Sequence, residues 1–160
     1  MWPETIDDPM FGVIRRLPSQ SFYDSGNYRG TVKPWPELRA QISFTVPLFS
    51  PEKLAQTLEL AHHLHPKIME QIGTFKNLKV GRFTNQGTLK NWLESEDNLS
   101  EGGDYNELHI DFQLDFYPEP TAQPSVVSLS FYEWDSCGGI RCSYYLNKDL
   151  EVVGSYDIAF

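Results

Sequence analysis

The stretch NELHIDFQLDFYP, residues 106–118, decides the fold class of this chain. Its apolar residues occupy every second position: Leu108, Ile110, Phe112, Leu114 and Phe116. A period of two over this length predicts a β-strand with one face in a core and the other face largely wet. Such alternation is typical of antiparallel sheets, because parallel strands tend to be apolar on both faces.

Further strands are predicted on both sides of this stretch. On its C-terminal side, alternating or apolar segments cover residues 126–134, 140–146 and 151–156. Consecutive strands joined by short turns predict a meander. On its N-terminal side, the candidate strands are residues 11–17, 28–33 and 40–49. The first two of these can pair as a hairpin.

One long helix is predicted after the N-terminal strands. Ser50, Pro51 and Glu52 are favourable helix-start residues, since Ser caps free N–H groups and Pro is tolerated in the first turn. Pro66 lacks a backbone donor, so we expect a kink or restart there. A shorter helix is predicted over residues 88–95. The expected fold is α+β: an antiparallel sheet packed against one long, kinked helix and a shorter helix, in a single domain of residues 1–160 with a loose segment at residues 1–10.

The composition excludes several function classes. The 160 residues include 13 Lys and Arg against 22 Asp and Glu, a net charge of −9. Such a surface repels nucleic acid and anionic lipid, whose binding depends on Lys and Arg. No segment has the length of an apolar membrane span, and the acidic N-terminus does not resemble a targeting peptide. The two cysteines, Cys137 and Cys142, are expected as reduced thiols in a cytoplasmic protein.

An acidic segment without a base precedes the deciding strand. Its carboxylates are Glu94, Glu96, Asp97, Glu101, Asp104 and Glu107. We interpret it as a mobile loop that attracts a basic protein partner. Tyr132 and Trp134 fall on the strand face opposite Leu129, and exposed aromatic residues of this kind are typical interface anchors.

Catalytic and metal-binding alternatives rest on histidines and carboxylates. His109 and Asp111 share a strand face and could form an acid–base pair or a metal site. His62 and His65 share a helix face, without a further ligand at the next helical position. The acidic loop lacks the ligand spacing of a calcium site, and neither cysteine has the electropositive surroundings of a nucleophile. No catalytic motif is present, and no cofactor is expected.

Several short motifs resemble a bacterial domain family of unknown function. They comprise Phe11-Gly12, the segment Tyr28-Arg29-Gly30-Thr31-Val32, the pair Trp134-Asp135, and Val152-Val153-Gly154 followed by Asp157. The family's usual turn contains a Glu-His pair, which Ser136, Cys137, Gly138 and Gly139 replace here. The resemblance implies a small cytoplasmic domain without known catalysis, of a kind found in toxin–immunity loci.

We therefore expect a non-enzymatic protein-binding domain, with an immunity-type inhibitor of a basic toxin domain as its narrower form. The alternatives are a metal-dependent hydrolase that uses His109 and Asp111, and a self-associating structural module that forms a homodimer.

Overall fold

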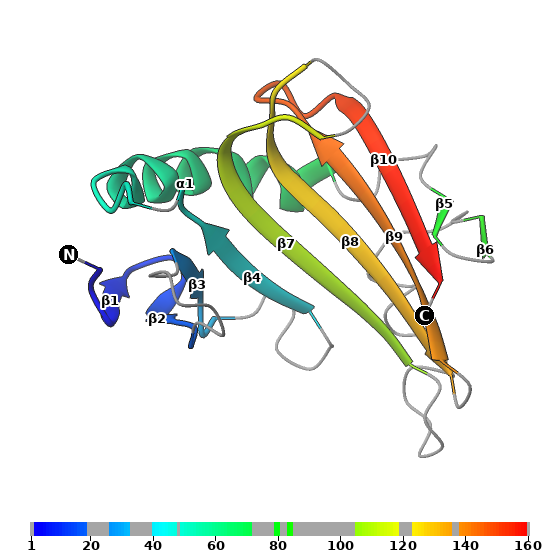
Figure 1. Cartoon of the computed structure of the whole chain (residues 1–160), viewed down its shortest axis with the longest axis horizontal. Coiled ribbons are helices and arrows are strands. Elements are labelled where there is room, and N and C mark those ends of the chain that lie inside the picture. The colour runs from blue at the N-terminus through cyan, green and yellow to red at the C-terminus, as the bar shows by residue number, and fades with distance from the viewer. Residues whose placement is uncertain are drawn as a thin grey trace.

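An eight-stranded β-sheet dominates the computed structural model of the chain (Figure 1). Its strands lie in the order β1-β2-β3-β4-β7-β8-β9-β10. The structure describes residues 2–18, 26–32, 40–47, 49–71, 79–80, 83–84, 105–118, 123–135 and 138–159. Figure 1 shows the long C-terminal strands side by side, as the predicted meander requires.

The secondary structure elements follow one another along the chain with these bounds. The first four strands are β1 (Thr5–Asp8), β2 (Gly12–Arg16), β3 (Asn27–Arg29) and β4 (Ala40–Thr45). The helix α1 spans Lys53–Gln71. The long strands are β7 (Tyr105–Phe116), β8 (Ser125–Asp135), β9 (Gly138–Leu146) and β10 (Val152–Ala159). The short strands β5 (Lys79–Val80) and β6 (Phe83–Thr84) pair in a separate two-stranded sheet.

The sheet is mixed, which corrects the expectation of an antiparallel one. β4 and β7 pair in parallel, whereas the other neighbours in the eight-stranded sheet pair antiparallel. The intervening chain contains α1, and parallel neighbours need such a crossover. The alternation in β7 reports that its two faces have different environments, and this holds although one of its two neighbours is parallel.

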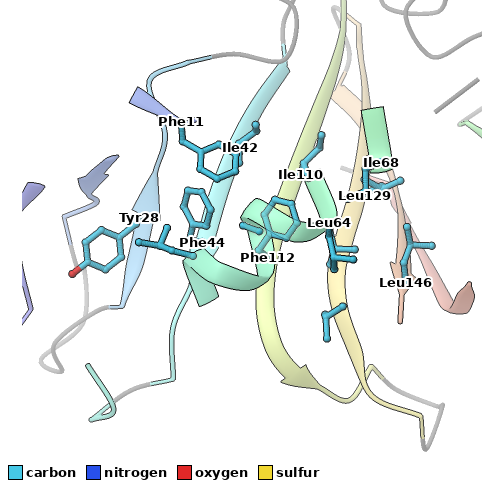
Figure 2. Packing of buried hydrophobic residues seen from close by; sticks show 14 of the residues in the cluster. Phe11, Tyr28, Ile42, Phe44, Leu64, Ile68, Ile110, Phe112, Leu129 and Leu146 are labelled. Carbon is cyan, nitrogen blue, oxygen red and sulfur yellow. The ribbon is translucent and has the colours of Figure 1, made fainter. Parts of the chain in front are cut away.

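The core lies between α1 and one face of the sheet (Figure 2). The helix contributes Leu54, Leu58, Ala61, Leu64 and Ile68, and the sheet contributes Ile42, Phe44, Leu108, Ile110, Phe112, Leu129 and Phe131. The ring of Phe44 lies 5.0 Å from that of Phe11 and 5.9 Å from that of Phe112, between ring centroids. Aromatic pairs at such separations stabilise a core beyond their buried area.

The alternation of β7 ends before its last residues. Leu108, Ile110 and Phe112 are fully buried, but Leu114 is only partly buried and Phe116 is 36% exposed. The register between β7 and β8 shifts between Phe112 and Phe116, and Asp115 has a φ of 48°. The expectation that Leu114 and Phe116 continue the core face is therefore wrong, because a β-bulge turns the strand there.

α1 is one continuous helix through Pro66, so the predicted kinked or restarted helix is not supported. Leu64 and Ile68 are both buried on either side of the proline. Tertiary packing of an apolar helix face provides most of a helix's stability, so it holds the helix together despite one missing hydrogen bond. The predicted shorter helix at residues 88–95 lies outside the described residues. No described helix is long and apolar enough to cross a membrane.

Residues 2–8 of the N-terminal segment lie against the sheet. Thr5–Asp8 pairs with β2, and Trp2 is buried. The hydroxyl of Tyr28 donates to the carbonyl oxygen of Pro3 at 2.8 Å. A side chain on Gly26 would collide with the carbonyl of Val46 and the ring of Trp2. No pattern in the sequence predicts this docking, since a single Trp before an acidic segment has no periodicity.

Replacing Pro66 with Ala should stabilise the fold. Pro66 is exposed, and Ala would supply the missing N–H for the carbonyl of His62 one turn earlier. The gain should be about 1–2 kcal/mol, since Pro costs about 3 kcal/mol in a helix interior while its restriction of the unfolded chain recovers part of that cost. Urea unfolding of both proteins measures the difference. A lower free energy of unfolding in Pro66→Ala would contradict this account of α1.

Candidate functional site

The face of the sheet opposite the core is polar and carries His109 and Asp111. Strand register aligns its side chains in rows that cross several strands. One row contains Ser43, Asp111, Ser128 and Tyr145; the next contains Gln41, His109, Ser130 and Ser143; a third contains Glu107, Tyr132 and Arg141. We call this surface the polar face. The predicted shared orientation of His109 and Asp111 is confirmed.

Asp111 is held in place by hydroxyl groups of the neighbouring strand. Ser43 Oγ donates to its Oδ1 at 2.7 Å, and Thr45 Oγ1 lies 3.1 Å from both carboxylate oxygens. Burial raises the pKa of Asp111 above its ordinary value, although these two hydrogen bonds and the nearby His109 act in the opposite direction. The hydrogen bonds therefore fix the orientation of the carboxylate, but they do not fully offset the free-energy cost of removing its charged form from water.

His109 lies among groups that compete for one ring nitrogen. Its Nε2 lies 3.1 Å from Oε2 of Glu107 and also contacts the side-chain amide nitrogen of Gln41. A protonated Nε2 donates to Glu107, whereas an unprotonated Nε2 accepts from Gln41. The ring of Tyr132 lies 4.5 Å from the His109 ring, between centroids. Tyr132, predicted to be an exposed anchor, is therefore half-buried against a histidine.

Ser130 is the hydroxyl residue aligned with His109 in the neighbouring strand β8. Its hydroxyl pairs with that of Ser143 at 2.8 Å. Nucleophilic catalysis needs a hydroxyl or thiol in hydrogen-bond reach of its base. Within the described ranges, no group of three or more His, Cys, Asp or Glu side chains could hold a metal ion.

A pocket of about 130 Å³ opens beside Asp111 on the polar face. Its walls are Asp111, Gln113, Phe116, Ser125, Val126, Val127, Ser128 and Tyr145. The rings of Phe116 and Tyr145 lie 5.7 Å apart between centroids. Ser125 Oγ donates to the carbonyl oxygen of Phe116 at 3.0 Å, which fixes the backbone that carries this ring. We call this hollow the Asp111 pocket.

His62 and His65, predicted as a weak metal-site candidate, have structural partners. His62 Nε2 lies 2.6 Å from Oδ2 of Asp8, and its ring stacks on Phe11. Oδ1 of Asp8 accepts hydrogen bonds from the backbone N–H groups of Met10 and Phe11. Burial alone would raise the pKa of Asp8, but these backbone bonds and His62 outweigh it, so this pKa is lowered. The pair thus ties the β1–β2 turn to α1.

The ring of His65 packs against core phenylalanines, whereas His62 pairs with Asp8. Its ring lies edge-on to those of Phe11 and Phe112, at centroid distances of 5.4 Å and 6.4 Å. Burial lowers the pKa of His65, which favours the neutral ring. Its Nδ1 is buried without a hydrogen-bond partner among the described residues. This environment is unsuited to a metal ligand that shares an ion with His62.

The remaining predicted site residues divide between described and undescribed parts of the chain. Trp134 lies in β8 opposite Tyr105, and only its backbone is described. Five predicted acidic site residues lie outside the described residues: Glu94, Glu96, Asp97, Glu101 and Asp104. Cys142 is buried in the core, and Cys137 is outside the described residues.

The sequence pattern does not predict the hydrogen-bond partners of Asp111, which are Ser43 and Thr45. Ser43 and Thr45 alternate with Ile42 and Phe44, so their polar orientation was visible in the pattern. Their position beside Asp111 was not, because it depends on the parallel pairing of β4 with β7. Tyr145 and Phe116 come together only through the β7 bulge.

Comparison with known proteins adds no relative. No protein-family model, no curated protein and no solved structure matches the chain.

Asp111→Asn should stabilise the protein at neutral pH. Because the folded-state pKa is raised, the carboxyl group favours the folded state at low pH and loses that contribution as the pH rises through the folded pKa. Asn carries no charge and can accept or donate at Ser43 and Thr45. We expect a higher free energy of unfolding for Asp111→Asn at pH 7, and a difference that shrinks as the pH falls below the ordinary Asp range.

Urea unfolding at a series of pH values measures this difference. Asp157→Asn, which removes an exposed carboxylate of β10, is the matched control and should show little effect. A destabilised Asp111→Asn at neutral pH would show that the ionised carboxylate stabilises the fold.

Proposed function

We propose that this chain is a non-enzymatic binding protein for a basic protein partner. The observation that carries the proposal is the C-terminal end of β7, where two exposed aromatic residues follow an exposed carboxylate. Phe116 is 36% exposed and Tyr117 is 58% exposed, and Asp115 precedes them in the chain. We call Asp115, Phe116 and Tyr117 the β7 patch. It lies at the rim of the Asp111 pocket through Phe116.

Aromatic residues suit this role for a physical reason. They bury a large area on binding and lose little conformational freedom, so they dominate the affinity of many interfaces. Asp115 and Asp111 would add charge complementarity to a basic partner. The bulge and the Ser125 hydrogen bond fix the backbone of the patch before binding, which lowers the ordering cost.

The net charge of −9 favours a basic partner over an acidic one. In this proposal the acidic residues Glu94, Glu96, Asp97, Glu101 and Asp104 steer the partner toward the protein. Charges of this kind mainly raise the association rate and narrow partner choice. Trp134 and Tyr132 remain candidate contacts, although Tyr132 is engaged with His109.

The narrower form of the proposal is an immunity-type inhibitor of a basic toxin domain, acting in the bacterial cytoplasm. Its support is the resemblance carried by Phe11-Gly12, Trp134-Asp135 and Val152-Val153-Gly154.

A second candidate, the self-associating module, is favoured by the position of β10. This strand of 8 residues is at one end of the sheet order, and its Tyr156 is 48% exposed. An edge strand presents unpaired backbone groups on which another strand can add. Light scattering over a concentration series distinguishes the two: a dimer mass that falls on dilution supports this candidate, and a constant monomer mass contradicts it.

Substitutions in the β7 patch should reduce the capture of the partner. The immobilised protein should retain a basic protein from its host's lysate, and the double variant Asp115→Asn, Tyr117→Ala should retain at least about tenfold less, since central aromatic anchors often contribute more than a factor of ten. Asn tolerates the positive φ of residue 115, so the backbone is preserved. Quantitative mass spectrometry of the bound fraction measures the effect.

Two controls make this experiment decisive. Phe49→Ala removes an aromatic ring that is 72% exposed but lies outside the β7 patch, and it should retain the partner as the wild type does. An unrelated acidic protein of matched charge should not retain it. Equal retention by the double variant, or by the acidic protein, would contradict the proposed binding surface.

A further inference from the structure

The Asp111 pocket owes its existence to the bulge in β7. Phe112 pairs with Val127 and Phe116 pairs with Ser125, so Gln113, Leu114 and Asp115 of β7 face Val126 alone in β8. The surplus residues open the ladder, and Asp115 accommodates the turn with a φ of 48°. Bulges often lie beside functional sites, where they redirect side chains. Here the bulge brings Phe116 to Tyr145, a residue of β9.

The pocket combines a negative wall with an aromatic wall. On one side lies the Asp111 carboxylate, oriented by Ser43 and Thr45. On the other side lie the rings of Phe116 and Tyr145. A cation between a carboxylate and aromatic faces gains both a charge pair and a cation–π interaction, and both strengthen where water is excluded. An anion would meet the carboxylate and be repelled.

We propose that the Asp111 pocket binds a primary alkylammonium group. Gln113 and Ser128 supply further oxygen acceptors for its N–H donors, and Val126 and Val127 line the pocket where an alkyl chain would lie. The volume of about 130 Å³ is far more than one water needs, so it can admit the ammonium with part of its chain. A divalent metal ion is less suited, because it requires several oxygen ligands around one point.

The source of the ammonium group connects the pocket to the proposed function. A lysine side chain of the basic partner is the source we infer, and this part rests on the proposed function. The β7 patch would then contact the partner's surface while the lysine enters beside Phe116. The chemistry of the pocket itself is independent of the partner and would also accept a free alkylamine.

Nuclear magnetic resonance titration of the isotope-labelled chain tests the pocket directly. We expect n-butylammonium to produce saturable shifts at the amides of Asp111, Gln113, Ser128 and Tyr145, with a millimolar dissociation constant. The uncharged n-butanol should bind at least about tenfold more weakly, because it lacks the charge pair. Shifts that do not saturate, or equal binding of n-butanol, would overturn the proposal.

Substitutions test the contributions of the negative wall and the aromatic wall to n-butylammonium binding. Asp111→Asn should weaken n-butylammonium binding about tenfold or more, whereas Asp157→Asn, outside the pocket, should leave it unchanged. Phe116→Leu keeps an apolar side chain but removes the ring, and should weaken binding several-fold. If Asp111→Asn does not fold, Phe116→Leu still tests the pocket. Unchanged affinity in a folded variant of either wall overturns the assignment of that wall.

Short peptides separate the pocket from the proposed function. A capped Gly-Lys-Gly peptide that binds, with its norleucine counterpart inactive, supports a protein lysine as the source. If n-butylammonium binds but the Gly-Lys-Gly peptide does not, the result supports the pocket but assigns it to a free amine. If neither n-butylammonium nor the Gly-Lys-Gly peptide binds, while a basic protein is captured from the lysate through the β7 patch, the pocket inference alone is overturned. If n-butylammonium binds and no basic protein is captured, only the proposed function fails.

Discussion

The parallel pairing of β4 with β7 is the constraint on which the structure depends. Its register sets Phe44 beside Phe112 on one face and Ser43 beside Asp111 on the other. The first pair completes the aromatic cluster with Phe11 beneath α1. The second pair orients the carboxylate of the candidate site. A shift of one residue would exchange these faces, so burial of the phenylalanines also fixes the hydrogen bonds of Asp111.

The bulge at the end of β7 turns this regular sheet into a surface with a pocket. Along the first part of the strand, each residue has a partner in β8, and the polar face is filled by cross-strand contacts such as Ser130 with Ser143. Where the register shifts, the ladder opens and Phe116 leaves the core face to meet Tyr145. The same irregularity therefore exposes the aromatic residues of the β7 patch and forms the cavity beside Asp111.

Among the described residues, the carboxylates of Asp8 and Asp111 have shifted pKa values and illustrate different roles. Asp8 accepts two backbone hydrogen bonds and pairs with His62, so its ionised form is stabilised and secures a turn. Asp111 has hydroxyl donors but a raised pKa, so its ionised form carries an uncompensated desolvation cost. Groups that cost stability are expected where function requires them. Asp111 also lines the pocket on the polar face, whereas the hydrogen bonds of Asp8 hold the β1–β2 turn.

The sequence by itself determined strands β2 to β4 and β7 to β10, the position of α1 and the sidedness of the sheet. Alternation in residues 106–118 placed Leu108, Ile110 and Phe112 in the core and His109 and Asp111 on the polar face, because a strand turns successive side chains to opposite sides. Only the tertiary structure decided that β4 lies parallel to β7, that α1 continues through Pro66, and that Trp2 docks beside Tyr28. Each of these depends on contacts between segments far apart in the chain, to which a local pattern is blind. The Asp111 pocket belongs to the same class: its carboxylate, its hydroxyl donors and its aromatic wall come from β4, β7, β8 and β9, and the register of these strands alone brings them together.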